Sequence, residues 1–469
     1  MTGCVFARRF KFSPSSLIHS PFFLIKMFAA LKQWWNKLDS NVRLLYIFTA
    51  TYYSTVGILK EHLLSGFIFV LTNSNKHVGL VKGITGLFQL CFALPSGYTA
   101  DKFRRDKVLR VGGSVGLVAC ATSIAGFWFE SINLIFVAFS IWGIFNVLHG
   151  PALEALFADC YPQGQRSLPC TIKYVLMQVA LILGPALSTG ILYINGNRWE
   201  LTDLKVVLII GAVLCAASLS SLFLFKEPAK QNAAAESEKE VFKNDEGDNV
   251  DQVSWLGLQR RHVPFLLILS EFIISNGAGM TISFFPIFFF QEYGLAPAEV
   301  NIVFIATSVF VVMLSMGSQN LSTCFCSRMQ VIVSTRFIAT CCLVWMSFAK
   351  PLWLQIALFI VRGGTMRATV GIRKSILMDH VPQKQRGRWN SFESLTVCTS
   401  TASTVVGGYL IDAYSYRFCF RITAAFYALA VMVDTMLLTV VRDTNKEEQS
   451  WISKEKAAAG SGGVKSGIL

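Results

Sequence analysis

The sequence is poor in charge, since only 15% of its 469 residues are Asp, Glu, Lys or Arg and 53% are hydrophobic. Together with a positive mean hydropathy, this balance excludes a soluble globular protein of this length and predicts a chain embedded in a lipid bilayer. Lys and Arg number 42 against 28 Asp and Glu. In a membrane protein, an excess of basic residues is explained by the cytoplasmic loops, which are rich in Lys and Arg. The excess is therefore no sign of a nucleic-acid partner, and we expect none.

Motifs for catalysis and metal binding are also scarce. The sequence contains no His-Glu-x-x-His zinc motif and no Gly-x-x-x-x-Gly-Lys-(Ser/Thr) phosphate loop. We therefore expect no enzyme, no ATP-driven pump, no metal site and no cofactor. Most of the 12 cysteines lie in apolar runs, which is typical of small helix-packing residues and not of a disulfide framework.

One short stretch of the chain recurs. Residues 158–166 read ADCYPQGQR, and 220 residues later 378–386 read MDHVPQKQR. The same offset relates Gly97 to Gly317, each of which closes an apolar run. One offset that holds at separated points indicates two homologous halves that arose by duplication.

The apolar runs define the predicted fold class, because a spanning helix needs roughly 20 apolar residues. About twelve runs qualify, near 43–72, 78–98, 108–128, 132–157, 168–194, 205–225, 263–291, 298–319, 329–349, 352–378, 389–411 and 418–441. We predict an all-α integral membrane protein with twelve transmembrane helices in two six-helix pseudo-symmetric halves. Its expected segments are an N-terminal tail (1–42), a first half (43–225), a linker (226–262), a second half (263–441) and a flexible tail (442–469).

The basic residues predict the topology. They cluster after the second run, over 102–110, and after the tenth, over 384–388. The positive-inside rule places these loops, both termini and the linker in the cytoplasm. The first 42 residues contain no acidic residue before Asp39, a composition that resembles an organellar transit peptide. The alternative is a cytoplasmic tail that lies partly on the membrane surface, so the plasma membrane and an organelle membrane both stay open.

The loop after the second run resembles a family signature. It reads GYTADKFRR over 97–105, and the major facilitator superfamily of secondary transporters carries Gly-x-x-x-Asp-(Arg/Lys)-x-Gly-(Arg/Lys)-(Arg/Lys) there. The matching residues are Gly97, Asp101, Lys102 and Arg105. Arg104 replaces the second glycine and Asp106 replaces a base. The resemblance implies that this loop holds the inner ends of the two halves together.

Two further runs are compared with the same family. Gly184 and Pro185 resemble the start of the Gly-Pro-x-x-Gly-Gly motif of its antiporters, with Ser and Thr in place of the final glycines. In the fourth run, Asn146 stands four residues before Gly150, where many proton-coupled members have an arginine. That departure argues against the usual proton relay.

Polar residues inside apolar runs are the candidates for a transport cavity, because a charge near a helix centre costs about 2.5–3.5 kcal/mol on insertion scales. They are Lys60, Glu61, His62, Asn146, His149, Glu271, Asn276, Arg362 and Arg367. The alternative is structural: a buried Lys–Glu pair in the first run, and a packed imidazole at His149. Arg362 and Arg367 differ by about 140° around a helix, so we expect only one to face the cavity.

The first run allows two geometries. In one, a single long tilted helix spans 43–71; in the other, the helix ends near Leu59 and 63–71 form a re-entrant or kinked extension. We expect the first. Lys60 and its two neighbours then lie close to the bilayer midplane and face a wet cavity.

These observations favour a secondary active transporter of a small organic solute that works by alternating access and is coupled to protons. The carboxylates of Glu61 and Glu271 are the expected proton carriers, and Glu271 ranks first because its own helix places no base within a turn of it. Lys60 and the arginines favour an anionic solute, and aromatic residues such as Tyr52 and Tyr53 an amphipathic one. The alternatives are a facilitative uniporter of the same fold and, from another class, a receptor or scaffold that does not transport. We expect a monomer.

Overall fold

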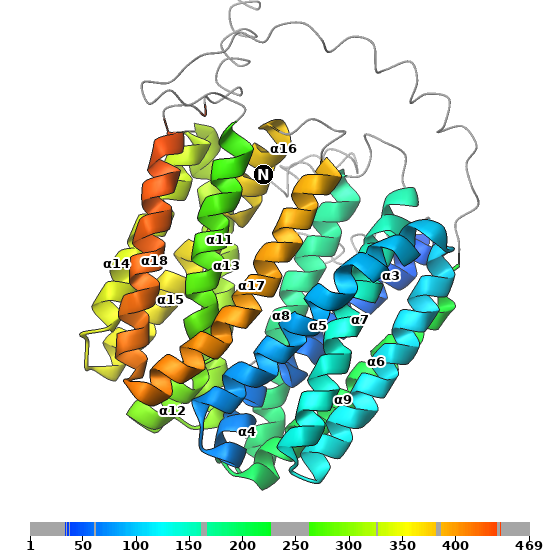
Figure 1. The fold of residues 1–469 in the computed structure, drawn as a ribbon, viewed down its shortest axis with the longest axis horizontal. Coiled ribbons are helices and arrows are strands. Elements are labelled where there is room, and N and C mark those ends of the chain that lie inside the picture. Colours follow the sequence, from blue (N-terminus) through cyan, green and yellow to red (C-terminus); the bar gives the residue numbers. More distant parts are fainter. Residues whose placement is uncertain are drawn as a thin grey trace, which may run out of the picture.

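The computed structural model describes residues 38–60, 62–160, 167–226, 262–324, 327–380 and 386–438, with a few isolated positions besides. Nearly all of the expected tails and linker lie outside these ranges. Within them, the regular elements are helices that pack lengthwise into one bundle (Figure 1).

The first half contains six spans. Its helices are α3 (Ser40–Leu59), α4 (His62–Thr72), α5 (Asn75–Lys102), α6 (Arg105–Trp128), α7 (Ile132–Asp159), α8 (Ser167–Asn195), α9 (Leu201–Leu219) and the 3-10 helix η2 (Ser220–Leu224). Two consecutive pairs, α3 with α4 and α9 with η2, each make one span.

The second half contains another six spans. Its helices are α11 (Val263–Ile282), α12 (Phe285–Tyr293), α13 (Pro297–Cys324), α14 (Arg328–Met346), α15 (Leu352–Ala368), α16 (Val370–His380), α17 (Arg386–Ala413) and α18 (Tyr416–Leu437). Every predicted run coincides with one helix or one consecutive pair. The prediction of twelve transmembrane helices in two halves is therefore confirmed.

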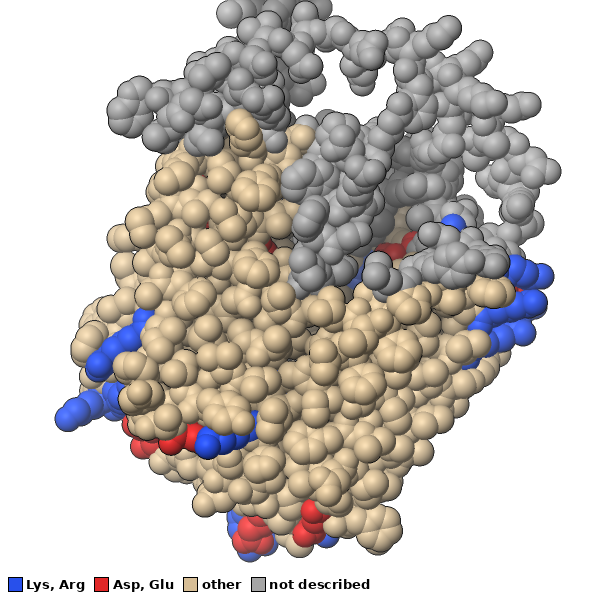
Figure 2. Space-filling view, in the orientation of Figure 1, with Lys and Arg blue, Asp and Glu red and all other residues tan. Residues whose placement is uncertain are grey.

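The two halves lie side by side, and α5 of the first packs against α17 of the second (Figure 1). We call the end of the bundle that carries α4 and α12 the lower end, and the end that carries α16 the upper end, as they appear in Figure 1. Figure 2 shows a broad surface without acids or bases between the charged groups of the two ends. Such a belt fits the hydrocarbon layer of a bilayer.

The first span differs from the single helix that we expected. The structure ends α3 at Leu59 and starts α4 at His62, so the prediction of an uninterrupted helix over 43–71 was wrong. Lys60 still donates its N–H to Val56 O at 2.9 Å, whereas its carbonyl oxygen accepts a hydrogen bond from Lys82 Nζ at 2.6 Å. A side chain that satisfies a backbone carbonyl in this way permits the break.

The crossing of α3 and α8 depends on two glycines. A Cβ added to Gly184 would lie 2.4 Å from Ser54 O and 2.9 Å from Gly57 Cα. Small residues at such a crossing let two backbones approach closely in lipid. The Gly184-Pro185 pair therefore has a packing role within the first half.

A nucleophile-like spacing in α6 has no catalytic geometry. Gly112, Ser114 and Gly116 match Gly-x-Ser-x-Gly, but they lie inside a regular helix, where Ser114 Oγ donates to Arg110 O at 3.1 Å. Hydrolases of that motif place the serine on a sharp strand-to-helix turn. These residues are instead part of the helix packing of the first half.

Candidate functional site

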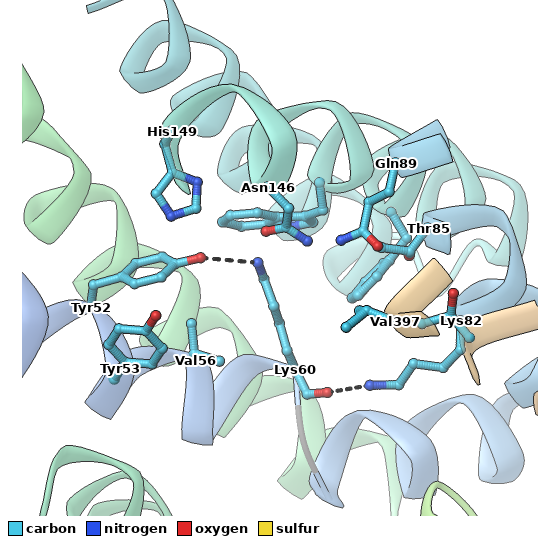
Figure 3. Close-up of a pocket in the computed structure, with 13 residues that line it drawn as sticks. Tyr52, Tyr53, Val56, Lys60, Lys82, Thr85, Gln89, Asn146, His149 and Val397 are labelled. Carbon is cyan, nitrogen blue, oxygen red and sulfur yellow. Dashed lines mark hydrogen bonds between the residues drawn. The ribbon is translucent and has the colours of Figure 1, made fainter. Parts of the chain in front are cut away.

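A pocket of about 310 Å³ lies between the two halves. Its lining comes from α3, α5 and α7 of the first half and from α17 of the second, and Figure 3 shows these side chains converging. The lining residues are Tyr52, Tyr53, Val56, Lys60, Lys82, Thr85, Gln89, Phe139, Trp142, Asn146, His149, Val397 and Thr401. A volume of this size suits a small organic molecule.

Lys60 is the central cation of the pocket. Its Nζ lies 3.4 Å from the centroid of the Trp142 ring and 3.5 Å from the Tyr52 hydroxyl oxygen (Figure 3). The negative face of an indole ring is the strongest aromatic partner for an ammonium group. The aromatic side chains thus hold the Lys60 ammonium group at the pocket wall.

Lys82 and Gln89 were not among the predicted site residues. Lys82 reaches the pocket from α5 and binds the Lys60 carbonyl (Figure 3). Gln89 Oε1 is shielded from solvent and has no hydrogen-bond partner among the described residues. A shielded acceptor on a pocket wall is suited to a donor group of a solute. Both residues are isolated polar positions in the apolar run over 78–98. The search for polar residues inside apolar runs would therefore have identified them.

Asn146 and His149 lie on α7 and both line the pocket. His149 is 8% exposed, its Nδ1 lies 2.9 Å from Phe145 O, and its ring stacks on Phe145 with centroids 4.1 Å apart. His149 is therefore packed against neighbouring rings and also lines the pocket. The structural and the cavity interpretation of this histidine are compatible.

The two residues after Lys60 differ in what the structure describes. Glu61 lies outside the described residues. The His62 ring stacks on Phe304 of α13, with ring centroids 3.4 Å apart, and so contacts the other half. The structure thus places His62 at the boundary of the halves and not on the pocket wall.

The predicted residues of α11 and α15 lie away from this pocket. Asn276 Nδ2 donates to Phe272 O at 2.8 Å and to Thr399 Oγ1 at 3.3 Å. Arg362 is 5% exposed, and its guanidinium carbon lies 4.5 Å from the Phe285 ring centroid. Arg367 is exposed. Neither arginine lines the pocket, because α15 packs within the second half.

Glu271 is held by bases from other helices. Its own helix offers none, as expected, but Arg336 Nη2 of α14 lies 2.9 Å from its Oε2. Arg373 of α16 pairs with the same oxygen. Glu271 therefore has no base on its own helix, but the tertiary structure brings two guanidinium groups from other helices to this carboxylate.

The signature loop at the upper end is described only in part. The backbone of 97–102 continues α5, while the burial of Gly97 and the side chains of Asp101 and Lys102 lie outside what the structure describes. Asp106, which replaces a base of the signature, lies 3.1 Å from Arg104 Nε and 3.8 Å from Arg110 Nη2. The expected role of Asp101 and Arg105 stays a prediction.

The lower end of the bundle is closed by contacts between the halves. Trp199 Nε1 donates to Leu295 O at 2.6 Å, and Asn301 Nδ2 donates to Ser188 Oγ at 3.0 Å in a buried position. Beside the pocket, a Cβ on Gly83 would lie 2.3 Å from Val405 Cγ2. The two halves are therefore in direct contact below the pocket, through packed backbone and side chains.

Comparison with known families gives a match over most of the chain. The model described as "Major Facilitator Superfamily" matches residues 44–270 and again 267–465. A Na(+), Li(+), K(+)/H(+) antiporter of Planococcus maritimus is 32% identical over 142 residues, which cover 29% of this chain. The match spans only 32% of that antiporter's length.

Solved structures of low sequence identity share the fold. A bacterial homologue of the human lysosomal transporter Spinster, in an inward-facing and occupied conformation, has a TM-score of 0.65 at 13% identity, covering 85% of this chain and 96% of its own. A D-xylose–proton symporter has a TM-score of 0.64 at 12% identity, with coverages of 86% and 98%. At such identities the likeness concerns the fold alone.

Proposed function

The chain belongs to the major facilitator superfamily, and on that basis we propose that it is a proton-coupled secondary transporter of a small anionic, partly aromatic organic solute. The observation that carries this proposal is the pocket between the halves, whose wall combines two lysines with stacked aromatic rings. In this fold, a solute site at the boundary of two halves is exposed to each side in turn as the halves rock.

The pocket chemistry supports an anion. Two ammonium groups, Lys60 and Lys82, reach one cavity of low polarity, where charges interact more strongly than in water. Tyr52 and Trp142 offer apolar faces and a hydroxyl for the rest of the solute. The Gln89 acceptor adds a place for a hydroxyl or amine donor.

The orientation follows from the basic loops. We assign the upper end, which carries the signature loop, to the cytoplasm. The contacts of Trp199 and Asn301 between the halves at the lower end support an inward-facing arrangement in an alternating-access cycle. Both termini are then cytoplasmic.

An uptake screen in proteoliposomes tests the proposal. Radiolabelled aromatic and aliphatic carboxylates are offered with and without an imposed pH gradient, and we expect gradient-driven accumulation of at least one, abolished by an uncoupler. Lys60→Met should reduce that uptake at least tenfold, while Lys350→Met, on an exposed loop, should not. Uptake of the same compound that ignores the gradient indicates a uniporter, and wild-type uptake by Lys60→Met contradicts the anion site.

A second candidate is exchange of a monovalent cation for protons. It is favoured by the name of the Planococcus maritimus relative, although only a third of that protein is matched. Pulses of NaCl, KCl or LiCl are added to acid-loaded proteoliposomes that contain a pH-sensitive dye. Alkalinisation by a cation, with no carboxylate accumulated in the screen, would favour exchange over solute transport.

A further inference from the structure

A group of charged side chains lies inside the second half, apart from the pocket. Arg336 Nη1 of α14 donates to Asp434 Oδ2 of α18 at 2.5 Å, and its Nη2 lies 2.9 Å from Glu271 Oε2 of α11. Arg373 of α16 completes the group through its pair with Glu271. Two acids and two bases from four helices therefore form one network, which we call the Arg336 network.

Asp434 is the most deeply buried member. It is fully shielded from solvent, and the Arg336 side chain is 5% exposed, whereas that of Glu271 is 35% exposed. One Asp434 oxygen, Oδ2, is bound by Arg336, while Oδ1 has no hydrogen-bond partner among the described residues. Buried carboxylate oxygens nearly always have partners. An open oxygen on a fully buried acid is a position where a proton can bind.

The fold itself does not require this network. The first half packs α3, α6 and α9 as the second packs α11, α14 and α18. The charged residues of α3, α6 and α9 lie near helix ends, at Arg43, 105–110, Asp203 and Lys205. Replacing buried ion pairs by apolar groups is often neutral or stabilising. A purely structural role therefore explains the network poorly.

We propose that Asp434 is a proton-binding residue of the transport cycle and that Arg336 transmits its protonation to Glu271. This inference rests on the proposed function and deepens it by naming a coupling site. A proton from the aqueous phase forms an O–H bond at Oδ1, no electrons move, and the network charge changes from zero to +1. The attraction between Asp434 and Arg336 falls, and Arg336 is then held by Glu271 and by Ser270 Oγ, 3.3 Å from Nη1.

The groups around Asp434 favour a proton over a metal cation. Arg336 of α14 contacts Asp434 directly, while Glu271 of α11 joins the network through Arg336, and Arg373 of α16 joins it through Glu271. Tyr427 lies on the same helix as Asp434, near Arg362. The Arg336 guanidinium at hydrogen-bond distance repels a metal cation, whereas a proton becomes part of a covalent O–H bond. The described residues also contain no cluster of three His, Cys, Asp or Glu side chains suited to a metal.

The network also connects the break of the tenth span to the rest of the half. Thr369 separates α15 from α16, and Arg373 of α16 donates to Leu267 O of α11 at 2.6 Å as well as pairing with Glu271. A change in how strongly Arg336 holds Glu271 therefore alters what holds α16 against α11. This is a physical route from a buried proton to the upper end of the bundle.

Infrared difference spectroscopy of the reconstituted full chain tests proton binding without a known solute. Lowering the pH should raise a carboxylic-acid carbonyl band that Asp434→Asn lacks and Glu130→Gln keeps, because Glu130 pairs with Lys205 outside the network. An unchanged band in Asp434→Asn would overturn the proposal. If that variant does not fold, Asp434→Asn combined with Arg336→Gln removes both charges of the pair and is read in the same way.

A conformational readout separates coupling from a structural role. Spin labels at Ile194→Cys and Tyr414→Cys, two exposed lower-end positions in opposite halves, report the separation of the halves as pH is varied. We expect a pH-dependent shift in the wild type that Asp434→Asn abolishes and Asp434→Glu restores. An Asp434→Asn variant that keeps the wild-type pH dependence, or a wild type without any, contradicts the inference.

The experiments distinguish failure of the Asp434 proton site from failure of the proposed solute. If no carboxylate is transported but the acid band and the pH-dependent distance both depend on Asp434, the solute is wrong and the proton site stands. If gradient-driven uptake is found and Asp434→Asn leaves it intact, the proton site fails alone.

Discussion

Asp412, in the last turn of α17, binds the N-terminus of α5 through Asn75, which belongs to the other half. Its Oδ1 accepts from Asn75 N at 3.1 Å and from Asn75 Nδ2 at 2.9 Å, and its Oδ2 accepts from Lys76 N at 3.1 Å. The N–H groups of a helix N-terminus are without intrahelical partners and favour a negative charge. Asp412 thus caps a helix of the opposite half at the lower end.

A second contact mirrors this one. Asn197, just beyond α8, accepts a hydrogen bond at Oδ1 from Ala298 N at the start of α13, with a length of 2.9 Å. In each half, the residue near the end of the fifth span therefore caps the second span of the other half. One cap is charged and the other is neutral, so the two differ in electrostatic strength.

We predict that Asp412→Asn weakens the lower closure. The neutral amide keeps one acceptor but loses the charge, which contributes about 0.3–1 kcal/mol at an exposed helix N-terminus. At the upper value this is roughly a fivefold change in the population of closed molecules. The distance between labels at Ile194→Cys and Tyr414→Cys measures that population, with Cys91→Ser and Cys341→Ser to remove the exposed thiols among the described residues.

Two controls test whether the predicted effect of Asp412→Asn comes from the helix cap. High salt should reduce the difference between Asp412→Asn and the wild type, because an exposed charge is screened. Glu292→Gln removes another lower-end acid, which pairs with Arg417 inside the second half, and should leave the distance unchanged. An equal effect of Glu292→Gln would mean that general surface charge, and not the cap, controls closure.

The mirrored cap gives a prediction of opposite sign. Asn197→Asp adds the missing charge at the N-terminus of α13, so it should increase the closed population by a similar factor. Asn197 has φ 50°, a left-handed conformation that Asp tolerates as Asn does. The same label pair measures it, with Glu200→Gln, beside the cap, as the charge control. A decrease in the closed population would contradict the electrostatic account.

Much of the fold could be predicted because its cause is local. Apolar runs of bilayer length specify helices wherever they occur, and the duplicated stretch around Asp159 and Asp379 revealed the two halves. The sequence left a break near Leu59 open as an alternative, but its cause could not be read from that pattern. The break depends on Lys82, whose side chain reaches the Lys60 carbonyl from another helix, and such a contact exists only after the helices have packed.

The candidate site was predicted less completely. Lys60, Asn146 and His149 lie on the pocket wall, whereas Arg362 faces aromatic rings inside the second half. Arg336 and Asp434 were missed although each is an isolated charge in an apolar run, which is the criterion that selected Glu271. Spacing along one helix says nothing about partners on other helices, so neither the network nor the two caps could be inferred.

Gly184 offers a test of close packing with an internal control. We predict that Gly184→Ala lowers stability by about 1–3 kcal/mol, because the new methyl group meets the backbone of α3 and cannot be accommodated by a side-chain movement. Gly190→Ala, on the same helix, meets nothing within 4 Å and should be neutral or slightly stabilising. Thermal unfolding of both variants in one detergent measures the difference. Equal melting temperatures would remove Gly184 from the α3–α8 contact.

Lys82 offers a test of the broken first span. Lys82→Met removes the donor that satisfies the part-buried Lys60 carbonyl, and a fully buried carbonyl without a partner costs about 1–3 kcal/mol, which sets the upper range. We therefore expect a lower melting temperature and, because Lys60 is then repositioned against Trp142, at least a tenfold loss of carboxylate uptake. Lys82→Arg keeps a donor at that position and should retain most of the stability. Lys76→Met, which loses only a contact 5.1 Å from the Tyr409 ring centroid, is the matched control. A Lys82→Met variant as stable as the wild type would contradict a role of Lys82 in maintaining the break.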